Sequence, residues 1–249
     1  MRAESGQRSA VSAQPEADSE QRKATSPASS PTPDHIQRGQ AAYAQLLEAF
    51  GPPDWGTPAP PLDELVNTIL SQNTNDRNRD VAFTRLRQRF PTWEAVRDAP
   101  LDELIDCVRP AGLGNQKGAR IQQVLRQISA ERGSLDLSFL AQLPDCEALA
   151  WLTRFKGVGP KTAAIVLVFS LGKPAFPVDT HVYRVSGRIG LRPAEISVEQ
   201  AHAYLSGVFQ PAQYGPGHLL LIRLGREICH ARKPACPTCP LAAICQKNI

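Results

Sequence analysis

The chain has 249 residues, of which 42% are hydrophobic and 21% charged, and its formal net charge is +4. This composition is typical of a globular protein with enough chain for one large domain or two smaller ones. No apolar run approaches the roughly 20 residues of a membrane-spanning helix, which excludes an integral membrane protein. The N-terminus has no apolar signal-peptide segment, so we expect a cytoplasmic protein whose six cysteines are reduced thiols or metal ligands.

Residues 1–35 contain only two large apolar side chains, Met1 and Val11. They carry four basic and five acidic residues, so the positive excess lies in the rest of the chain. Such a segment cannot bury enough apolar surface to offset the conformational entropy lost on folding. The sequence therefore predicts that residues 1–35 form a disordered tail.

The rest of the chain shows helical periodicity, because apolar residues recur every three or four positions and Pro or Gly residues separate the segments. Two strand-like runs, 165–169 and 219–222, lie inside longer helical patterns and are assigned to helices. The sequence therefore predicts an all-α protein. The predicted helices cover residues 36–50, 62–70, 81–90, 92–98, 101–108, 115–131, 145–155, 160–171, 179–190, 197–209 and 214–228.

The strongest chemical signal is a group of four cysteines near the C-terminus with the spacing C-x6-C-x2-C-x5-C. The four are Cys229, Cys236, Cys239 and Cys245. Thiolates are soft metal ligands, and both a four-cysteine zinc site and a [4Fe–4S] cluster need four of them. Zinc sites usually use two C-x2-C pairs and only one is present, so the spacing favours iron–sulfur modestly. Disulfides come a distant third.

A second signal is the run K-G-V-G-P-K-T-A at residues 156–163. Two glycines around Val158 permit a tight hairpin between two helices, and Pro160 suits the first position of the second helix. Free backbone N–H groups at Gly157, Val158 and Gly159 can then face a phosphate. This pattern predicts a helix–hairpin–helix, although an ordinary corner between two helices is an alternative.

Lys161 lies in the first turn of that second helix, where the helix dipole disfavours another positive charge. We therefore expect a lowered pKa and an amine able to form a Schiff base, although a phosphate-contacting lysine fits the hairpin equally well. Asp179, in V-D-T-H-V, is placed to cap the next helix. Its alternative role is a carboxylate that faces Lys161 and stabilises positive charge developing on a sugar.

These three motifs, in this order, resemble endonuclease III, a DNA glycosylase and abasic-site lyase of the helix–hairpin–helix, Gly-Pro-Asp superfamily. The resemblance extends from about residue 36 to the end of the chain. It implies a [4Fe–4S] cluster on the four cysteines. It also implies a six-helix barrel over residues 62–172 that contains the helix–hairpin–helix, a cluster domain of residues 36–61 and 173–249, and a DNA groove between the two lobes.

The resemblance further implies a monomer that binds double-stranded DNA containing damaged bases or abasic sites. Its catalytic lysine and aspartate fall on Lys161 and Asp179. The implied reaction is removal of an oxidised pyrimidine from a nucleotide that is flipped out of the duplex. Lys161 attacks C1′ with the support of Asp179, and the resulting Schiff base allows strand cleavage by β-elimination.

Two further regions resemble DNA-contacting elements of the family, and basic residues outside them also suit DNA binding. Leu113, in the loop 111–117, matches a leucine that wedges into the base stack. In the segment 71–76, Gln72 comes one position earlier than the usual glutamine and Asn73 stands in its place, so either residue is a candidate to fill the gap left by the flipped base. Lys156, Arg232 and Lys233 add cations that suit phosphate contacts.

Two alternatives to this function stay open. A mismatch-type adenine glycosylase is disfavoured by Lys161, because monofunctional relatives have another residue there. A non-catalytic helix–hairpin–helix module with a metal knuckle is disfavoured by the presence of both Lys161 and Asp179. The remaining cysteines, Cys107 and Cys146, lie alone in helical segments and are interpreted as small hydrophobic residues.

Overall fold

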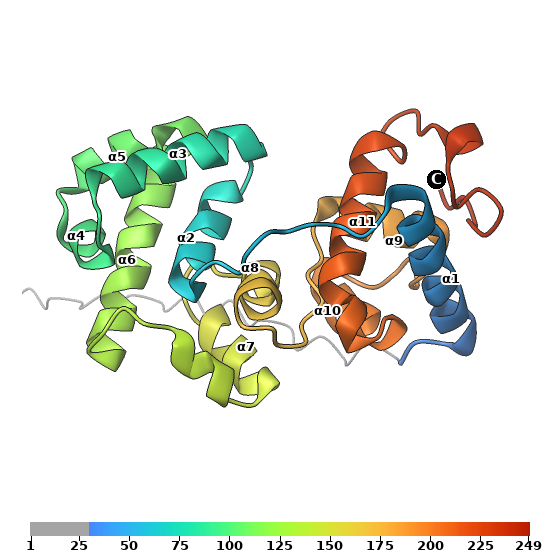
Figure 1. The fold of residues 1–249 in the computed structure, drawn as a ribbon, viewed down its shortest axis with the longest axis horizontal. Coiled ribbons are helices and arrows are strands. Elements are labelled where there is room, and N and C mark those ends of the chain that lie inside the picture. The colour runs from blue at the N-terminus through green and yellow to red at the C-terminus, as the bar shows by residue number, and fades with distance from the viewer. Residues whose placement is uncertain (1–29) are drawn as a thin grey trace, which may run out of the picture.

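The computed structural model describes residues 30–249, and every regular element in that range is helical (Figure 1). The predicted all-α class is confirmed. The α-helices of this range are α1 (Pro33–Phe50), α2 (Pro61–Ser71), α3 (Asp76–Arg89), α4 (Trp93–Asp98), α5 (Leu101–Val108), α6 (Gly114–Arg132), α7 (Asp145–Thr153), α8 (Pro160–Ile165), α9 (Thr180–Ile189), α10 (Val198–Val208) and α11 (Tyr214–Glu227). Among residues 30–249, no helix is long and apolar enough to span a bilayer.

Helix starts follow the capping signals in the sequence. Side chains of Asn75, Thr92 and Ser197 accept a backbone N–H from the first turn of α3, α4 and α10. Helix α1 begins earlier than predicted, because Thr32 caps it and a proline takes its first position. Residues 33–35 of the predicted tail are therefore helical, and residues 1–29 lie outside the described part of the chain.

The helices enclose two separate hydrophobic cores. Helices α2 to α8 surround the first core, which includes Leu65, Leu86 and Leu125 (left in Figure 1). Helices α1, α9, α10 and α11 surround the second, which includes Leu46 and Leu221 (right in Figure 1). The N-terminal helix thus packs with the C-terminal helices, and the chain crosses between the two cores twice.

The two segments that cross between the cores lie next to the candidate active site, and the second of them leads into Asp179. The first is the linker 51–60, and the second is the non-helical segment 171–179 between α8 and α9. The segment predicted as a helix over 160–171 is helical from Pro160 to Ser170, but it changes type: α8 ends at Ile165 and a π-helical turn, η3 (Val166–Ser170), follows directly. This turn contributes Val166 to the first core and Val168 to the second, so the junction touches both.

Candidate active site

Lys161 lies in the first turn of α8, directly after the hairpin, and its side chain is half-buried. The expected lowering of its pKa is confirmed, but the main cause is burial, which disfavours the charged ammonium. The carboxylates of Asp179 and Glu64 act in the opposite direction, and Arg79 adds to the lowering. A larger fraction of this amine is therefore unprotonated at neutral pH than for a lysine in water.

Asp179 caps helix α9, as its sequence context predicts. Its Oδ1 accepts a hydrogen bond of 2.7 Å from the backbone N–H of Val182. The carboxylate also acts electrostatically on Lys161, which makes it the largest influence that favours the lysine's charged form. In the described residues the two side chains form no ion pair, so Asp179 acts on the amine through the field of its charge and not by direct contact.

A second carboxyl group, Glu64 of α2, faces the same region and was not found by sequence reasoning. Burial raises its pKa, while a hydrogen bond of 3.1 Å from the Thr68 hydroxyl and the charges of Arg79 and Lys161 lower it. Helix α2 packs against α8, which brings Glu64 and Lys161 together although they are far apart in the sequence. No local pattern around Glu64 marks it as part of a site.

The hairpin between α7 and α8 has the expected glycine conformation at Gly157, where φ is +85°. The backbone N–H of Val158 donates to the carbonyl of Phe155 at 3.0 Å, and the Val158 side chain lies in the first core. Val158 therefore offers neither a free N–H nor an exposed side chain to a phosphate. Lys156 and Gly159, on either side of it, are exposed.

The contacts of Gln72 separate it from Asn73 as a candidate for the base gap. Gln72 Nε2 donates to the carbonyl of Gly157 at 3.0 Å, and its Oε1 accepts from Arg120 Nη1 at 2.7 Å. Both ends of this amide are therefore engaged within the protein. Asn73 is exposed, has a left-handed backbone with φ +52°, and forms no hydrogen bond within residues 30–249.

Leu113 stands out from the surface, with 52% of its area exposed and a left-handed φ of +52°. The loop that carries it is held by Lys117, which is only 1% exposed. The Lys117 ammonium donates to the carbonyls of Leu70 at 2.7 Å and Ala111 at 2.8 Å. One buried lysine thus connects the end of α2 to the Leu113 loop, a role that the sequence did not indicate.

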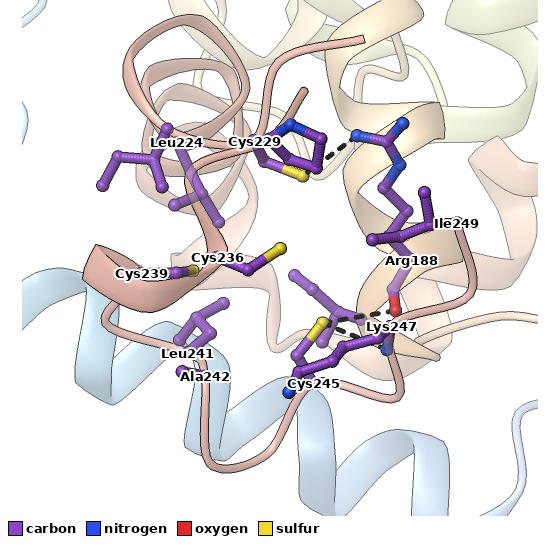
Figure 2. A pocket seen from close by; sticks show the side chains of 13 residues that line it. Arg188, Leu224, Cys229, Cys236, Cys239, Leu241, Ala242, Cys245, Lys247 and Ile249 are labelled. Atoms are coloured by element: carbon purple, nitrogen blue, oxygen red, sulfur yellow. Dashed lines mark hydrogen bonds between the residues drawn. The ribbon is translucent and has the colours of Figure 1, made fainter. Parts of the chain in front are cut away.

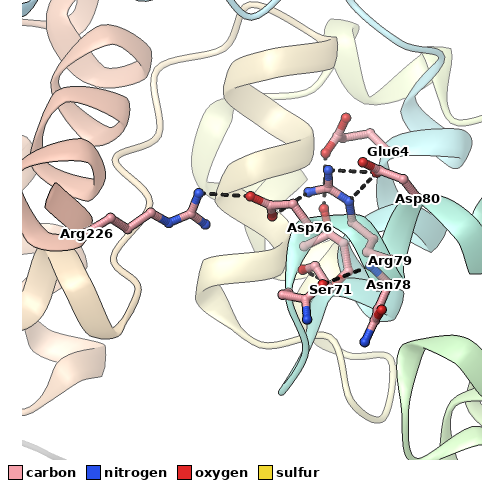
Figure 3. A network of polar contacts seen from close by, with 9 residues as sticks. Glu64, Ser71, Asp76, Asn78, Arg79, Asp80 and Arg226 are labelled. Atoms are coloured by element: carbon pink, nitrogen blue, oxygen red, sulfur yellow. Dashed lines mark hydrogen bonds and ion pairs between the residues drawn. The ribbon is translucent and has the colours of Figure 1, made fainter.

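An ion-pair network spans the two lobes beside this site (Figure 3). Asp76, at the start of α3, pairs with Arg226 of α11 at 2.8 Å and with Arg79 at 3.2 Å. Arg79 also pairs with Asp80 at 2.8 Å. Asp76 and Arg226 are each about half exposed, so the pair contributes little stability; it shows that the start of α3 in the first lobe lies next to α11 of the second.

The four predicted ligand cysteines surround one cavity, which Leu224 and other apolar residues also line (Figure 2). The donor set, four thiols in an apolar pocket, suits an iron–sulfur cluster. Within the described residues, no three His, Cys, Asp or Glu side chains are placed to hold a single metal ion.

Arg188 of α9 organises the loop between the first two cysteines. Its guanidinium donates to the carbonyls of His230 at 2.6 Å and Ala231 at 2.9 Å, and to Cys229 Sγ at 3.5 Å. The loop presents Arg232 and Lys233, both exposed and without hydrogen bonds or ion pairs in the described part of the chain. These two side chains are therefore free to meet a ligand.

Comparison with known proteins gives the family. A family model described as "HhH-GPD superfamily base excision DNA repair protein" matches residues 66–211. Endonuclease III of Sulfolobus acidocaldarius is 34% identical over 185 residues, which cover 73% of this chain and 80% of that protein. Endonuclease III of Thermotoga maritima is 33% identical over 186 residues, with coverages of 75% and 83%. An Arabidopsis thaliana protein named as a DNA glycosylase is 38% identical over 145 residues, but this chain spans half of its length.

Solved structures agree with these relatives. The fold is similar to that of a non-covalent endonuclease III–DNA complex, with a TM-score of 0.74, 27% identity, and coverages of 85% of this chain and 95% of that one. A trapped covalent intermediate of endonuclease III with DNA matches with the same TM-score and identity. The chain therefore belongs to the HhH-GPD superfamily and, within it, to the endonuclease III family of base excision repair enzymes.

Proposed function

We propose that this protein is a bifunctional DNA glycosylase and abasic-site lyase that removes oxidised pyrimidines from double-stranded DNA. The observation that carries the proposal is the half-buried Lys161, whose pKa is lowered by burial, next to the hairpin and within the field of Asp179. A lowered pKa increases the unprotonated fraction of the amine, and the unprotonated amine is the nucleophile for an electrophilic carbon.

In the proposed reaction, the damaged nucleotide leaves the base stack and the Lys161 amine attacks its C1′. The Nζ–C1′ bond forms as the bond from C1′ to the base breaks, and the base leaves with the electron pair and takes up a proton. Asp179 stabilises the positive charge that develops on the sugar. Loss of the Lys161 protons and opening of the sugar ring give the Schiff base. Removal of a C2′ proton then expels the 3′ phosphate.

We assign the DNA-contacting surface to the elements around this lysine. Asn73 is the residue proposed to fill the gap beside the orphaned base, because its amide is free while that of Gln72 is engaged. Leu113 is proposed to wedge into the stack. Lys156, Arg232, Lys233 and the N–H groups of Gly157 and Gly159 are proposed to contact phosphates, with Gln72 and Val158 in supporting positions.

We further propose that the four cysteines hold one [4Fe–4S] cluster, which would bond the four thiolates and so brace the loop that presents Arg232 and Lys233. The two lobes then correspond to a barrel domain of residues 62–172 and a cluster domain of residues 36–61 and 173–249. Analysis of purified protein for iron and acid-labile sulfide tests this assignment. Four of each per chain, with broad visible absorbance, are expected, whereas one zinc per chain and a colourless protein would contradict it.

We expect a monomer that acts on chromosomal DNA to lie at the chromosome, which in a bacterium is the nucleoid within the cytoplasm.

Borohydride trapping tests the reaction with duplexes that contain thymine glycol, an abasic site or a mismatched adenine. We expect trapped complexes on the first two substrates and none for Lys161→Gln. The Lys156→Ala variant is expected to need more DNA for saturation but still to be trapped. No trapping by the wild type would indicate a monofunctional glycosylase or a DNA-binding module.

A further inference from the structure

Two histidines hold the segment that leads into Asp179. Residues 171–179 are not helical, so the backbone carbonyls of buried Phe176 and Pro177 lack helical partners and need hydrogen bonds from elsewhere. His202 Nδ1, on α10, lies 3.0 Å from the Phe176 carbonyl oxygen. His218 Nδ1, on α11, lies 2.9 Å from the Pro177 carbonyl oxygen. Two consecutive carbonyls are thus held by two different helices of the second core.

These contacts define the tautomer of each histidine. A carbonyl oxygen only accepts, so Nδ1 must carry the proton and donate it. The neutral ring then leaves Nε2 without a proton. His218 is only 2% exposed and packs against Phe169, with ring centroids 6.0 Å apart. An imidazole held in this way is a rigid hydrogen-bond donor.

Burial keeps His218 neutral, although both the charge of Asp179 and the hydrogen bond to Pro177 favour its protonated form and raise its pKa. Burial lowers the pKa of His218 to about 4, the charge of Lys161 and the ring of His202 act in the same direction, and Asp179 opposes them without overcoming them. Burial likewise lowers the pKa of His202, with Glu199 acting in the opposite direction. At neutral pH neither ring adds a second positive charge beside Lys161.

From these contacts we infer that His218, supported by His202, is a positioning residue that fixes Asp179 relative to Lys161. Pro177 lies two residues before Asp179, and the Asp179 carboxylate is held on its other side by the N–H of Val182. The carboxylate is therefore fixed from both directions along the chain. This inference rests on the proposed function of Asp179 and adds a pair of residues that do not touch the substrate.

The effect on catalysis is tested with His218→Leu, His218→Asn and the control His35→Leu. His35, on α1, also bonds through Nδ1 within the second lobe, to the hydroxyl of Tyr204 on α10 at 2.6 Å, but it forms no hydrogen bond to residues 171–179. Displacing a catalytic group by about 1 Å can slow a reaction by up to about 100-fold, so we expect His218→Leu to lower the single-turnover excision rate roughly 10- to 100-fold with little change in DNA affinity. The Asn variant keeps an N–H donor near the Nδ1 position and should recover most of the rate.

Several results would overturn the inference. They are an unchanged rate in His218→Leu, an Asn variant as slow as the Leu variant, and an equal loss of rate in His35→Leu. Two measurements without DNA separate this test from that of the proposed function. In the wild type, nitrogen-15 NMR should report the Nδ1-protonated tautomer of His218, and an Nε2-protonated ring would contradict the assignment. The Val182 amide should exchange faster in His218→Leu than in His35→Leu.

Discussion

Gly157 and Arg120 provide a direct test of how the hairpin is held. Gly157 has φ +85°, and a Cβ added there would overlap the guanidinium of Arg120. An alanine in this left-handed conformation costs about 1–2 kcal/mol. Arg120 is flexible and can swing away, but it then loses its 2.7 Å hydrogen bond to Gln72. For a half-buried, charge-assisted bond we take about 1–2 kcal/mol. Gly157→Ala is therefore expected to lower the free energy of unfolding by about 2–4 kcal/mol.

A double-mutant cycle separates the two contributions. In the Arg120→Ala background the overlap is gone, so Gly157→Ala should cost only the backbone strain of about 1–2 kcal/mol. Urea unfolding of the wild type, both single variants and the double variant gives a coupling energy, expected to be about 1–2 kcal/mol. A coupling near zero would refute the argument, because it would mean that Arg120 does not lie over Gly157.

Two further predictions concern the buried residues Lys117 and His218, and a third concerns Asn73 and Gln72 at the proposed DNA surface. Lys117→Met leaves two buried carbonyls without donors and is expected to reduce the free energy of unfolding by about 2–4 kcal/mol in urea melts, with an unchanged value contradicting it. His218 is neutral in the folded chain down to about pH 4 but is protonated below its ordinary pKa of 6.5 when unfolded. Its contribution to the free energy of unfolding is therefore complete above pH 6.5 and decreases as the pH is lowered, with a loss of about 2 kcal/mol at pH 5. Urea unfolding at several pH values should show this loss in the wild type and not in His218→Leu. Asn73→Ala should flatten the dependence of excision on the base opposite the lesion, whereas Gln72→Ala should keep that dependence and weaken DNA binding, and the reverse pattern would contradict our assignment.

The helices were predictable because their signals are local. Apolar periodicity and the Pro and Gly residues between segments gave the predicted helices, and a capping threonine accounts for the early start of α1. The change from α-helix to π-turn after Ile165 was not predictable, because that whole run is apolar and its periodicity suits a continuous helix. Which core each of its side chains enters depends on packing between two lobes.

The residues of the candidate site also fall into two groups, those marked by a local sequence motif and those brought there by tertiary packing. Lys161, Asp179 and the cysteines belong to short motifs that a sequence displays directly. The engagement of Gln72 by Arg120 depends on a contact across 48 residues, and the bond from His218 to the Pro177 carbonyl crosses 41. Such long-range contacts leave no periodic or spacing signal in the sequence. The candidate reacting residues could therefore be predicted from sequence, whereas the residues that position them could not.

The most direct test of the central claim is to locate the covalent bond between protein and DNA. Enzyme incubated with an abasic-site duplex is reduced with borohydride, digested with nuclease and protease, and analysed by mass spectrometry. The account predicts that the sugar remnant is attached to Nζ of Lys161. Attachment to Lys156, to the N-terminal amine or to any other residue would contradict it, because the half-buried amine beside Asp179 would then not be the nucleophile.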